Sequence, residues 1–355
     1  MKKIVIVSPS LKIGGIERAL TVLANYFNEK GHKVLFISCL GGERFYTLNK
    51  EIEIKEPKLQ NKGGLSKLFF YVTILFFIRK EIKKFKPDVI LSFGDWFNPL
   101  VLLSLINLKY PIYISDRTSP DYNFNIFTKL GKKILYPLSS GFIAQTPLAA
   151  NYKIKQFGNK LNIKVIPNAI RNVNTIENIK ENIILYVGRF AWEKAPERLI
   201  QSFSQLRNLD NWNLHMAGSG PMLAQMKKMV IDLKIEKNVI FHGKVENVDY
   251  LLSRASIYVL PSILEGFPNA LCEALAAGVP SICFDSIPYQ GIVENEINGF
   301  VVKNVNELSN KLDYLIENQK VLMQQGKNAR TIKNTLSIDN VGENYLNFIL
   351  GMDKL

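Results

Sequence analysis

Short runs of apolar residues alternate with longer stretches of mixed polarity along the whole chain. In the first half, the pattern predicts strands near residues 3–8, 33–38, 88–93, 111–115, 141–144 and 163–166, and helices near residues 16–29, 65–86, 97–107, 123–137 and 146–156. In the second half, it predicts strands near residues 183–187, 212–217, 238–242, 257–260, 280–283 and 300–302, with helices between them. Strands that are apolar throughout and alternate with helices indicate parallel sheets covered on both faces. The predicted fold class is therefore α/β with two doubly wound, Rossmann-like sheets, whose ligands bind at the carboxyl ends of the strands.

Length and charge divide the chain near residue 170. A chain of 355 residues exceeds the size at which a single core stops growing, roughly 250–300 residues, so two domains are expected. Residues 1–171 hold 27 Lys and Arg against 11 Asp and Glu, whereas residues 172–355 hold 18 against 20. We therefore predict one domain over 1–170 and a second over 171–337, with residues 171–182 as a polar linker and a last helix from 338.

Two carboxylates, Glu265 and Glu273, stand on either side of a turn that opens a helix. Pro268 suits a first helical turn, so Glu265 lies in the loop before the helix and Glu273 about one turn inside it. The first amides of a helix attract anions. The candidate anion site is therefore Phe267, Pro268, Asn269, Ala270 and Leu271. Carboxylates beside an anion site suit a ligand that carries both hydroxyls and phosphates, such as a nucleotide sugar.

A second group of candidate residues follows a predicted strand about seventy residues earlier. The strand ends at Gly188, and two cations five positions apart come next, Arg189 and Lys194. The planar fork of an arginine and the point charge of a lysine are a common pair for holding phosphates. A single such cation is more often a surface charge, but together with the carboxylate pair these two predict a diphosphate site.

The ordered set of motifs resembles the retaining glycosyltransferases of family 4, which have the GT-B fold of two Rossmann-like domains facing a cleft. The resemblance covers nearly the whole chain and is carried by residues 8–18 with Gly14-Gly15, by Pro167-Asn168-Ala169, by Gly188-Arg189 with Lys194, by residues 217–221, by Pro261-Ser262, by Glu265 and Glu273, by residues 276–280 and by residues 299–302. In proteins of this fold the last helix crosses back onto the first domain. The C-terminal helix, about 338–355, is therefore expected to pack on the acceptor-binding domain, and the second domain to bind the nucleotide sugar.

The resemblance implies a role for each of these residues. Glu273 would hold the ribose hydroxyls of a UDP-sugar, and the candidate catalytic residues are Arg189 and Lys194 on the diphosphate and Glu265 on a sugar hydroxyl. Further donor contacts are implied for the glycine loop and for a loop after a strand of the second domain: Gly14, Gly15, His242, Gly243 and Val245. The leaving phosphate itself would take the acceptor proton in a front-face substitution. The physical reason for the role of the two cations is that fixed positive charges stabilise the charge that develops on a departing diphosphate.

One loop departs from the family pattern. Many members carry a His near the anomeric centre, in the loop after the fourth strand of the first domain. This chain has Asp116-Arg117 there. An arginine cannot act as a general base at neutral pH, so these two residues are candidates for contacts with the donor sugar or the acceptor.

No metal or other cofactor is expected. His32, His215 and His242 are scattered without ligand spacing, and the sequence contains no Asp-x-Asp. Two alternative functions stay open. One is a nucleotide-sugar epimerase on the same architecture, which would act without an acceptor; the other is a basic nucleic-acid-binding protein, for which no helix-turn-helix, zinc-finger or RRM signature is present.

The basic first half also suggests an anionic membrane surface as a partner. Residues 68–78 form an apolar run of 11 residues, too short to span a bilayer, and Lys80, Lys83, Lys84 and Lys86 follow. This segment, 67–86, is either a helix buried against a sheet or an interfacial helix, and both can hold on opposite faces. With three dispersed cysteines and no signal peptide, we expect a cytoplasmic protein attached to the inner membrane face, with a lipid-linked or oligosaccharide acceptor in polysaccharide assembly.

Overall fold

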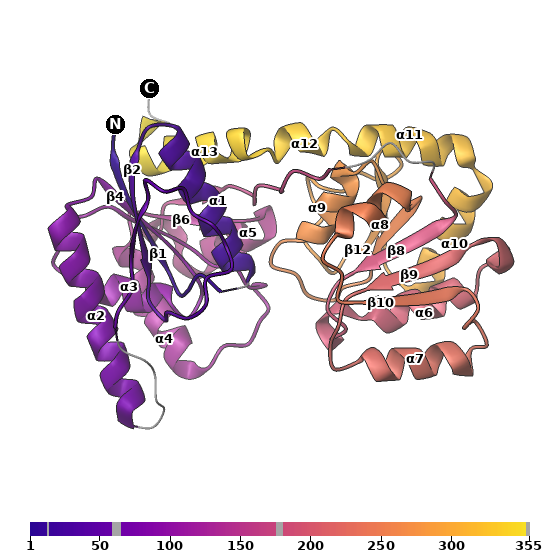
Figure 1. Ribbon diagram of the computed structural model, residues 1–355, viewed down its shortest axis with the longest axis horizontal. Coiled ribbons are helices and arrows are strands. Elements are labelled where there is room, and N and C mark those ends of the chain that lie inside the picture. The colour runs from indigo at the N-terminus through magenta and orange to yellow at the C-terminus, as the bar shows by residue number, and fades with distance from the viewer. Residues whose placement is uncertain (13, 59–64, 175–179, 353–355) are drawn as a thin grey trace. The chain divides into compact units, whose positions relative to one another are not determined.

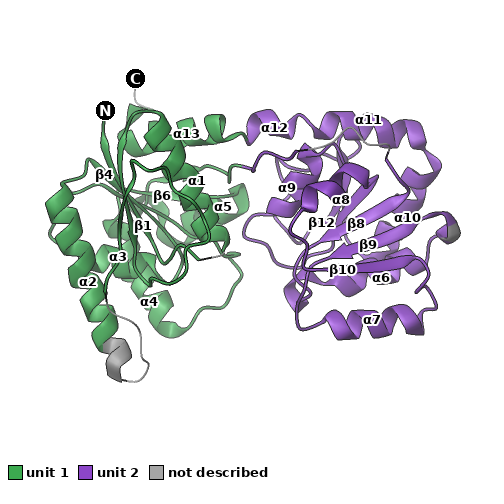
Figure 2. Cartoon of the chain, in the orientation of Figure 1, with its two compact units in different colours: residues 1–169, 337–355 green, residues 170–336 purple. Residues whose placement is uncertain are grey.

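The computed structural model describes residues 1–12, 14–58, 65–174 and 180–352, and the chain divides into two compact units. Unit 1 is Met1–Ala169 with Ser337–Leu355, and unit 2 is Ile170–Leu336 (Figure 2). The C-terminal segment therefore belongs to the same unit as the N-terminal half. Both units are α/β, and each is described separately below.

The described residues of unit 1 form a seven-stranded sheet in the order β3-β2-β1-β4-β5-β6-β7 (Figure 1). The strands are β1 (Lys3–Ser8), β2 (Lys33–Ser38), β3 (Glu53–Lys55), β4 (Val89–Phe93), β5 (Ile112–Ser115), β6 (Gly141–Ala144) and β7 (Ile163–Val165). All neighbouring pairs are parallel. The strand order reverses between β1 and β4, so the ligand-binding position of such a sheet lies at their carboxyl ends.

Helices cover both faces of this sheet. They are α1 (Gly15–Glu29), α2 (Leu65–Phe85), α3 (Asn98–Ser104), α4 (Ile126–Leu135), α5 (Pro147–Phe157) and α13 (Ile338–Leu350), with 3-10 turns at Tyr136–Leu138 and Gly158–Lys160. Side chains of α1 and α13 share one core with the sheet, and α2, α3 and α5 contribute to the core on the other face. Gly342 of α13 lies against the ring of Tyr26 of α1, where a Cβ would clash, so a glycine permits this close packing.

Helix α2 covers most of the 67–86 segment. Phe70, Ile74, Ile78 and Ile82 are buried at four-residue spacing, so one face of the helix packs on the sheet as the first of the two interpretations expects. The opposite face carries exposed aromatic and basic side chains. Over the part of the chain that the structure describes, no helix is long and apolar enough to cross a bilayer.

The described residues of unit 2 form a six-stranded sheet in the order β10-β9-β8-β11-β12-β13. The strands are β8 (Ile183–Val187), β9 (Asn213–Ala217), β10 (Val239–Gly243), β11 (Ile257–Leu260), β12 (Ser281–Phe284) and β13 (Gly299–Val302). The helices are α6 (Pro196–Ser204), α7 (Leu223–Asp232), α8 (Val248–Arg254), α9 (Asn269–Ala276), α10 (Val305–Glu317), α11 (Gln319–Ala329) and α12 (Ile332–Thr335), with 3-10 turns at Trp192–Lys194 and Leu209–Asn211. The strands are parallel, and the order reverses between β8 and β11. Two buried clusters fill the two faces of the sheet.

The segment expected to be a linker is in part packed onto unit 2. Val173, within the segment, is buried in one of the cores of unit 2, as is Ile170 just before the segment, whose amide donates to the Leu336 carbonyl oxygen at 2.9 Å. The remainder of the expected linker includes residues 175–179, which lie outside the described residues. The first residues of this segment are therefore a fixed part of unit 2.

Candidate functional site

The loops that follow β8 and β11 meet at the point where the strand order of unit 2 reverses. The first loop carries Arg189 and the turn Trp192–Lys194, and the second carries Glu265. The backbone amides of Ile263 and Leu264 both donate to the Glu193 carbonyl oxygen, at 2.8 and 3.2 Å. The two loops are therefore held side by side at the carboxyl edge of the sheet.

Lys194 and Glu265 form the closest charged contact between these loops. The Lys194 Nζ lies 2.5 Å from Glu265 Oε1, and the Ser262 hydroxyl donates to the same oxygen at 2.9 Å. The side chain of Glu265 is 9% exposed and that of Lys194 is 24% exposed. Two residues that the sequence predicted to share a ligand, 71 positions apart, thus lie in direct contact and are largely buried.

Arg189 is placed differently, at the surface of the same edge. Its side chain is 66% exposed and pairs with Glu193. Burial alone would raise the pKa of the Glu193 carboxyl, but a hydrogen bond from its own backbone and the guanidinium of Arg189 lower it. The Arg189 carbonyl oxygen accepts from the Tyr186 hydroxyl at 2.9 Å, so the backbone is fixed while the guanidinium stays at the surface.

The loop after β9 supports the Arg189 loop from the other side. The Gly188 amide donates to the Ala217 carbonyl oxygen at 3.0 Å, and the Phe190 amide donates to the Ser219 carbonyl oxygen at 3.0 Å. Gly218 has φ +142°, and a Cβ there would overlap the Gly188 carbonyl oxygen. A glycine is therefore required at 218 on both conformational and steric grounds.

Helix α9 begins directly after the Glu265 loop. Pro268 is its N-cap residue, and its side chain makes no capping hydrogen bond. The Asn269 amide donates to the Phe267 carbonyl oxygen at 2.9 Å, whereas the amides of Ala270 and Leu271 belong to the first turn, where no intrahelical acceptor exists. The helix therefore begins at Asn269, as the sequence predicts, and the binding of an anion at this end stays a prediction.

Glu273 lies one turn into α9 and is 8% exposed. Arg171 donates from Nε to Glu273 Oε2 at 3.2 Å and also pairs with Asp249. The Asn174 amide donates to Asp249 Oδ2 at 3.0 Å; burial opposes ionisation of this carboxyl, but Arg171 and the Asn174 amide lower its pKa. Arg171 and Asp249 therefore orient Glu273, a role that the sequence did not indicate, because Arg171 was interpreted as part of a linker.

His242, Gly243 and Val245 lie around the end of β10, which is the edge strand and is separated from β8 by β9. The His242 ring centroid is 4.9 Å from that of His215. Burial lowers the pKa of both histidines, and that of His215 falls to about 4. Gly243 has φ +65° at a register shift, and half-buried Val245 packs against a core cluster of unit 2. A contact of this group with a nucleotide base stays a prediction.

Asp116 of unit 1 is tied into a buried network of charges. It accepts hydrogen bonds from the Tyr136 hydroxyl and from Lys132 and pairs with Lys153, at 2.5, 3.0 and 2.6 Å. Burial would raise the pKa of the Asp116 carboxyl, but the two lysines lower it well below its ordinary value. Asp95, at the end of β4, also pairs with Lys132 at 2.6 Å. Burial and the neighbouring Asp116 raise the pKa of Asp95.

Arg117 is also engaged inside unit 1. Its guanidinium stacks 3.4 Å from the centroid of Phe93, donates to the Tyr345 hydroxyl of α13 at 2.9 Å and contacts Asn168. Its backbone amide donates to Asp95 Oδ2 at 2.9 Å. Arg117 therefore links the end of β5 to α13 and to Asn168. Its contact with a sugar or acceptor stays a prediction.

The glycine loop of unit 1 follows β1. Gly14 has φ −179°, an extended conformation that any residue adopts, and no protein atom lies within 4 Å of a Cβ built at Gly15. The Tyr46 hydroxyl donates to the Gly14 carbonyl oxygen at 3.0 Å. Backbone conformation and packing within the protein do not require a glycine at 15, and the close approach of a ligand to this loop stays a prediction.

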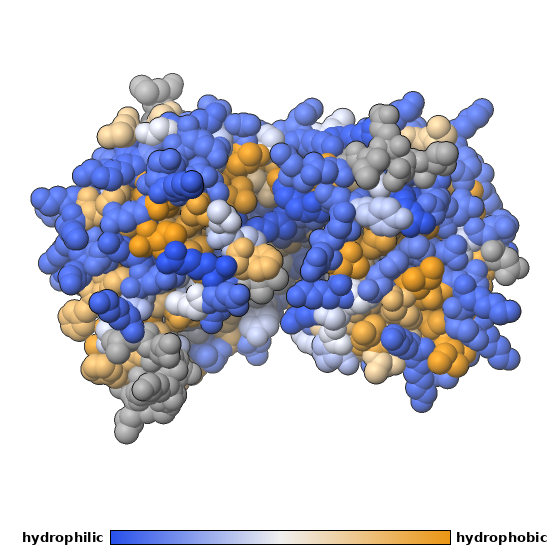
Figure 3. Space-filling model, in the orientation of Figure 1, coloured by the Kyte–Doolittle hydropathy of each residue, from blue (hydrophilic) through white to orange (hydrophobic). Residues whose placement is uncertain are grey.

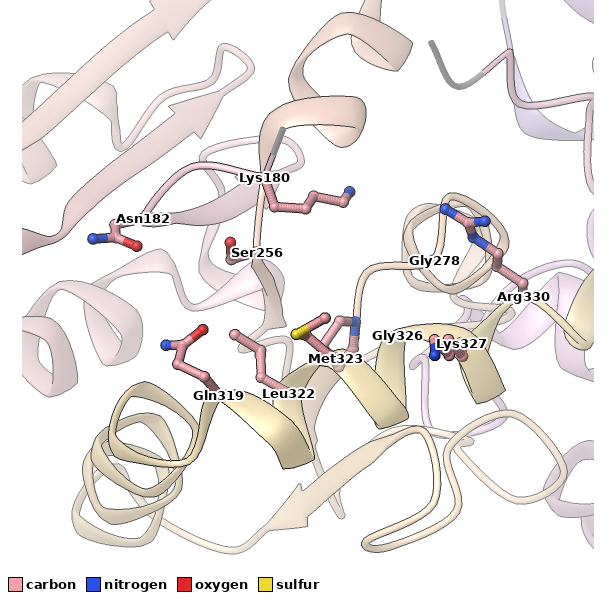
Figure 4. A pocket seen from close by; sticks show the side chains of 11 residues that line it. Lys180, Asn182, Ser256, Gly278, Gln319, Leu322, Met323, Gly326, Lys327 and Arg330 are labelled. Carbon is pink, nitrogen blue, oxygen red and sulfur yellow. The ribbon is translucent and has the colours of Figure 1, made fainter. Parts of the chain in front are cut away.

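A pocket of about 510 Å³ lies at the opposite, amino edge of the unit 2 sheet (Figure 4). Its lining includes Asn182 and Ser256, just before β8 and β11, and one side of α11. It is thus separate from the group around Lys194 and Glu265.

Among the residues that the structure describes, no three His, Cys, Asp or Glu side chains gather as metal ligands.

Comparisons with known proteins agree on one family. The model described as "Glycosyltransferase Family 4" matches residues 13–171, and the model described as "Glycosyl transferases group 1" matches residues 169–332. An "Uncharacterized glycosyltransferase" of Haemophilus influenzae is 27% identical over 338 residues, which is 94% of this chain and 95% of the relative. A Campylobacter jejuni protein is 28% identical over 98% of both chains; it is named as an α-1,4-N-acetyl-D-galactosaminyltransferase acting on a GalNAc-containing glycan linked to diphospho-undecaprenol.

Solved structures share the fold of the whole chain. A glycosyltransferase from Rickettsia africae superimposes with a TM-score of 0.83 at 20% identity and covers 99% of both chains. Anabaena Alr3699/HepE, solved in complex with UDP, superimposes with a TM-score of 0.81 at 16% identity and covers 98% of this chain and 100% of its own. Identities this low establish the arrangement of elements and nothing more specific.

Proposed function

Because the chain belongs to the family 4 glycosyltransferases and has their two-domain GT-B fold, we propose that it transfers a sugar from a UDP-sugar to a lipid-linked glycan acceptor, with retention of the anomeric configuration and without a metal ion. The observation that carries the proposal is the contact of Lys194 with Glu265, beside the N-terminus of α9 and the surface cation Arg189. These groups provide cations, amides and a carboxylate at one edge of one sheet. Such a set suits a ligand with a diphosphate and hydroxyls.

Each residue would act through a stated hydrogen bond. A lysine has three donors, so Lys194 can keep one on Glu265 and direct another at a phosphate oxygen. The exposed guanidinium of Arg189 can turn from Glu193 to the diphosphate, because Glu193 keeps the hydrogen bond from its own backbone. Glu265 would accept from a sugar hydroxyl. Glu273, oriented by Arg171, would accept from the ribose, since a carboxylate accepts about four hydrogen bonds in all.

The proposed chemistry is a front-face substitution. The bond between the anomeric carbon and the diphosphate oxygen breaks, the acceptor oxygen forms the new bond on the same face, and the leaving phosphate takes the acceptor proton. Arg189, Lys194 and the first amides of α9 would stabilise the charge that develops on the leaving diphosphate. Fixed donors of this kind are commonly the largest single contribution to catalysis.

Relatives support the proposed donor and acceptor classes. Alr3699/HepE has been solved with UDP and with UDP-glucose, and the Campylobacter jejuni relative is named for an undecaprenol-linked acceptor. An Erwinia amylovora relative is named for amylovoran biosynthesis. We therefore propose a place in cell-surface polysaccharide assembly, such as capsule or lipopolysaccharide, at the cytoplasmic face of the membrane. The epimerase alternative gains no support from these comparisons.

The test is a transfer assay with the full chain. UDP- and GDP-sugars are each incubated with undecaprenyl-diphosphate-linked oligosaccharides, and nucleotide release and product mass are measured. We expect UDP release that depends on the acceptor, together with an acceptor heavier by one sugar. Release of UDP that does not depend on the acceptor, or conversion of the donor to an epimer, would contradict the proposal.

A further inference from the structure

Helix α4 presents its apolar residues outward. Ile126, Phe127, Leu130 and Ile134 are 69%, 82%, 51% and 58% exposed, whereas its one buried residue is Lys132. Exposed apolar side chains also appear elsewhere on the face that Figure 3 shows, and isolated ones need no explanation. In α4, however, the usual arrangement of a surface helix is reversed, with the charged residue inside and the apolar residues outside.

Charge interactions hold α4 in this orientation. Lys132 Nζ lies 2.6 Å from Asp95 Oδ1 and 3.0 Å from Asp116 Oδ2, and both carboxylates are buried. Rotation of the helix to bury its apolar face would withdraw the lysine and leave two buried carboxylates with one fewer cation, a costly change. Gly131 adds close packing, since a Cβ there would lie 3.2 Å from Pro99. The outward apolar face is therefore a fixed feature of unit 1.

The exposed side chains form one stripe with a defined border. Positions 126, 127, 130 and 134 share one face of a helix, and exposed Tyr122 and Leu138 extend the apolar segment at both ends. Lys129 and Lys133 are exposed and lie along one side of the stripe, and residues 122–138 include no Asp or Glu. The segment is thus an apolar face bordered by positive charge alone.

Two features of this face favour an anionic bilayer over a second copy of the chain. In a symmetric pair of α4 helices the lysines of one copy would approach those of the other, which disfavours self-association. Anionic headgroups would pair with them instead. The ten residues of α4 span about 15 Å, so the helix is too short to cross a membrane and long enough to lie along its surface.

The neighbouring helices belong to the same layer. Helix α3 packs against both α2 and α4. The outward face of α2 carries exposed Phe69 and Phe76, 65% and 69% exposed, followed by exposed Lys80 and Lys83. The pattern of aromatic and basic residues on α2 therefore repeats that of α4 in the same helical layer.

We propose that α4 docks unit 1 on an anionic membrane, with Phe127 and Ile134 inserted at the boundary between headgroups and acyl chains and with Lys129 and Lys133 among the headgroups. This inference deepens the proposed function by naming the surface that meets a bilayer-embedded acceptor. Docking itself needs neither donor nor acceptor, so it can be tested separately from transfer.

The test is sedimentation of the full chain with vesicles of phosphatidylcholine alone or mixed with phosphatidylglycerol. The variant Phe127→Ser/Ile134→Ser removes two exposed apolar side chains, so its folding, checked by circular dichroism, is expected to be unchanged. We expect its partition onto anionic vesicles to fall roughly tenfold or more. The matched control is Ile231→Ser/Met323→Ser, which removes two apolar side chains that are 61% and 65% exposed on unit 2 and is expected to bind vesicles as the wild type does.

Other outcomes would overturn the proposal. Wild-type vesicle binding by the α4 variant, with loss of binding in Lys80→Glu/Lys83→Glu/Lys84→Glu, would assign docking to α2. A concentration-dependent dimer that the α4 variant abolishes, with no vesicle binding by the wild type, would assign the face to a second copy. The transfer assay with undecaprenyl-diphosphate-linked oligosaccharides separates the two proposals, because absence of transfer by the wild type would refute the proposed function but not the docking. With a short water-soluble acceptor, the α4 variant is expected to retain whatever transfer the wild type shows.

Discussion

Replacement of Arg189 by alanine separates a catalytic contribution from a structural one. The guanidinium of Arg189 is 66% exposed and pairs with Glu193, whose side chain is 18% exposed. In the variant Glu193 keeps the hydrogen bond from its own backbone and the nearby charge of Lys194, so its carboxylate is not left without a stabilising group. If Arg189 stabilises the departing diphosphate, the variant loses an interaction that strengthens in the transition state. Activity and stability are therefore expected to respond very differently to this one change.

The two magnitudes follow from the exposure of the side chain. Ion pairs with a solvent-exposed cation contribute about 0–1 kcal/mol, and Glu193 keeps its backbone hydrogen bond, so the free energy of unfolding is expected to fall by about 1 kcal/mol. Loss of one transition-state donor typically lowers turnover by roughly 10²–10³-fold, equivalent to about 3–4 kcal/mol. Lys194→Ala is a less clean test, because it leaves the 9% exposed Glu265 with the Ser262 hydroxyl alone and is expected to cost about 3 kcal/mol of stability as well.

The assay combines turnover with urea unfolding on the same preparations. Arg207→Ala is the matched control, because Arg207 is 71% exposed and pairs with Asp313 and Glu317 in unit 2. It is expected to retain turnover. Near-wild-type turnover by Arg189→Ala would remove Arg189 from the site, and a loss of turnover matched by a large loss of stability would show that the residue acts through folding.

Three further results are expected. Transfer should survive excess EDTA, because Arg189 and Lys194 are proposed to neutralise the diphosphate; complete loss that Mn²⁺ restores would refute this. Glu273→Gln should weaken UDP binding, measured by calorimetry, by roughly tenfold to a hundredfold through loss of a charge-assisted hydrogen bond, and unchanged affinity would exclude the ribose contact. Burial, with His242 and Arg254, lowers the pKa of folded His215 to about 4, so the stability that its neutral form contributes is present above about pH 6.5 and is lost as pH falls toward 4. Denaturant unfolding should show a loss of up to roughly 3 kcal/mol over that range, and His215→Asn should flatten the profile, whereas an unchanged profile would contradict the assignment to His215.

The elements that the sequence predicted well are those with a strong local pattern. Parallel strands buried on both faces are apolar throughout, so β1 and β8 are evident as runs of Ile, Val and Leu. Strand β3 was missed because Glu53-Ile54-Lys55 has a single apolar residue and pairs at an edge of the sheet. Helix α3 ends at Ser104, earlier than the predicted residue 107, because apolar residues continue beyond the end of the helix.

The candidate site was predictable as a set of residues but not as a set of contacts. Glu265, Lys194 and the start of α9 follow from chain order and turn chemistry. The pairing of Arg171 with Glu273 joins residues 102 positions apart, and such pairs leave no local pattern in a sequence. The sequence did not predict the burial of Lys132 for the same reason. Its partners, Asp95 and Asp116, follow β4 and β5 and are distant from it in the sequence.

The stereochemistry of the transferred sugar tests the proposed function most directly. The full chain is incubated with a UDP-α-sugar and a lipid-linked acceptor, and the new anomeric proton is followed by NMR from the first turnovers. We expect an α-linked product that appears together with UDP and that is unchanged by EDTA. A β-linked product, or consumption of the donor without a new glycosidic bond, would contradict the proposed function.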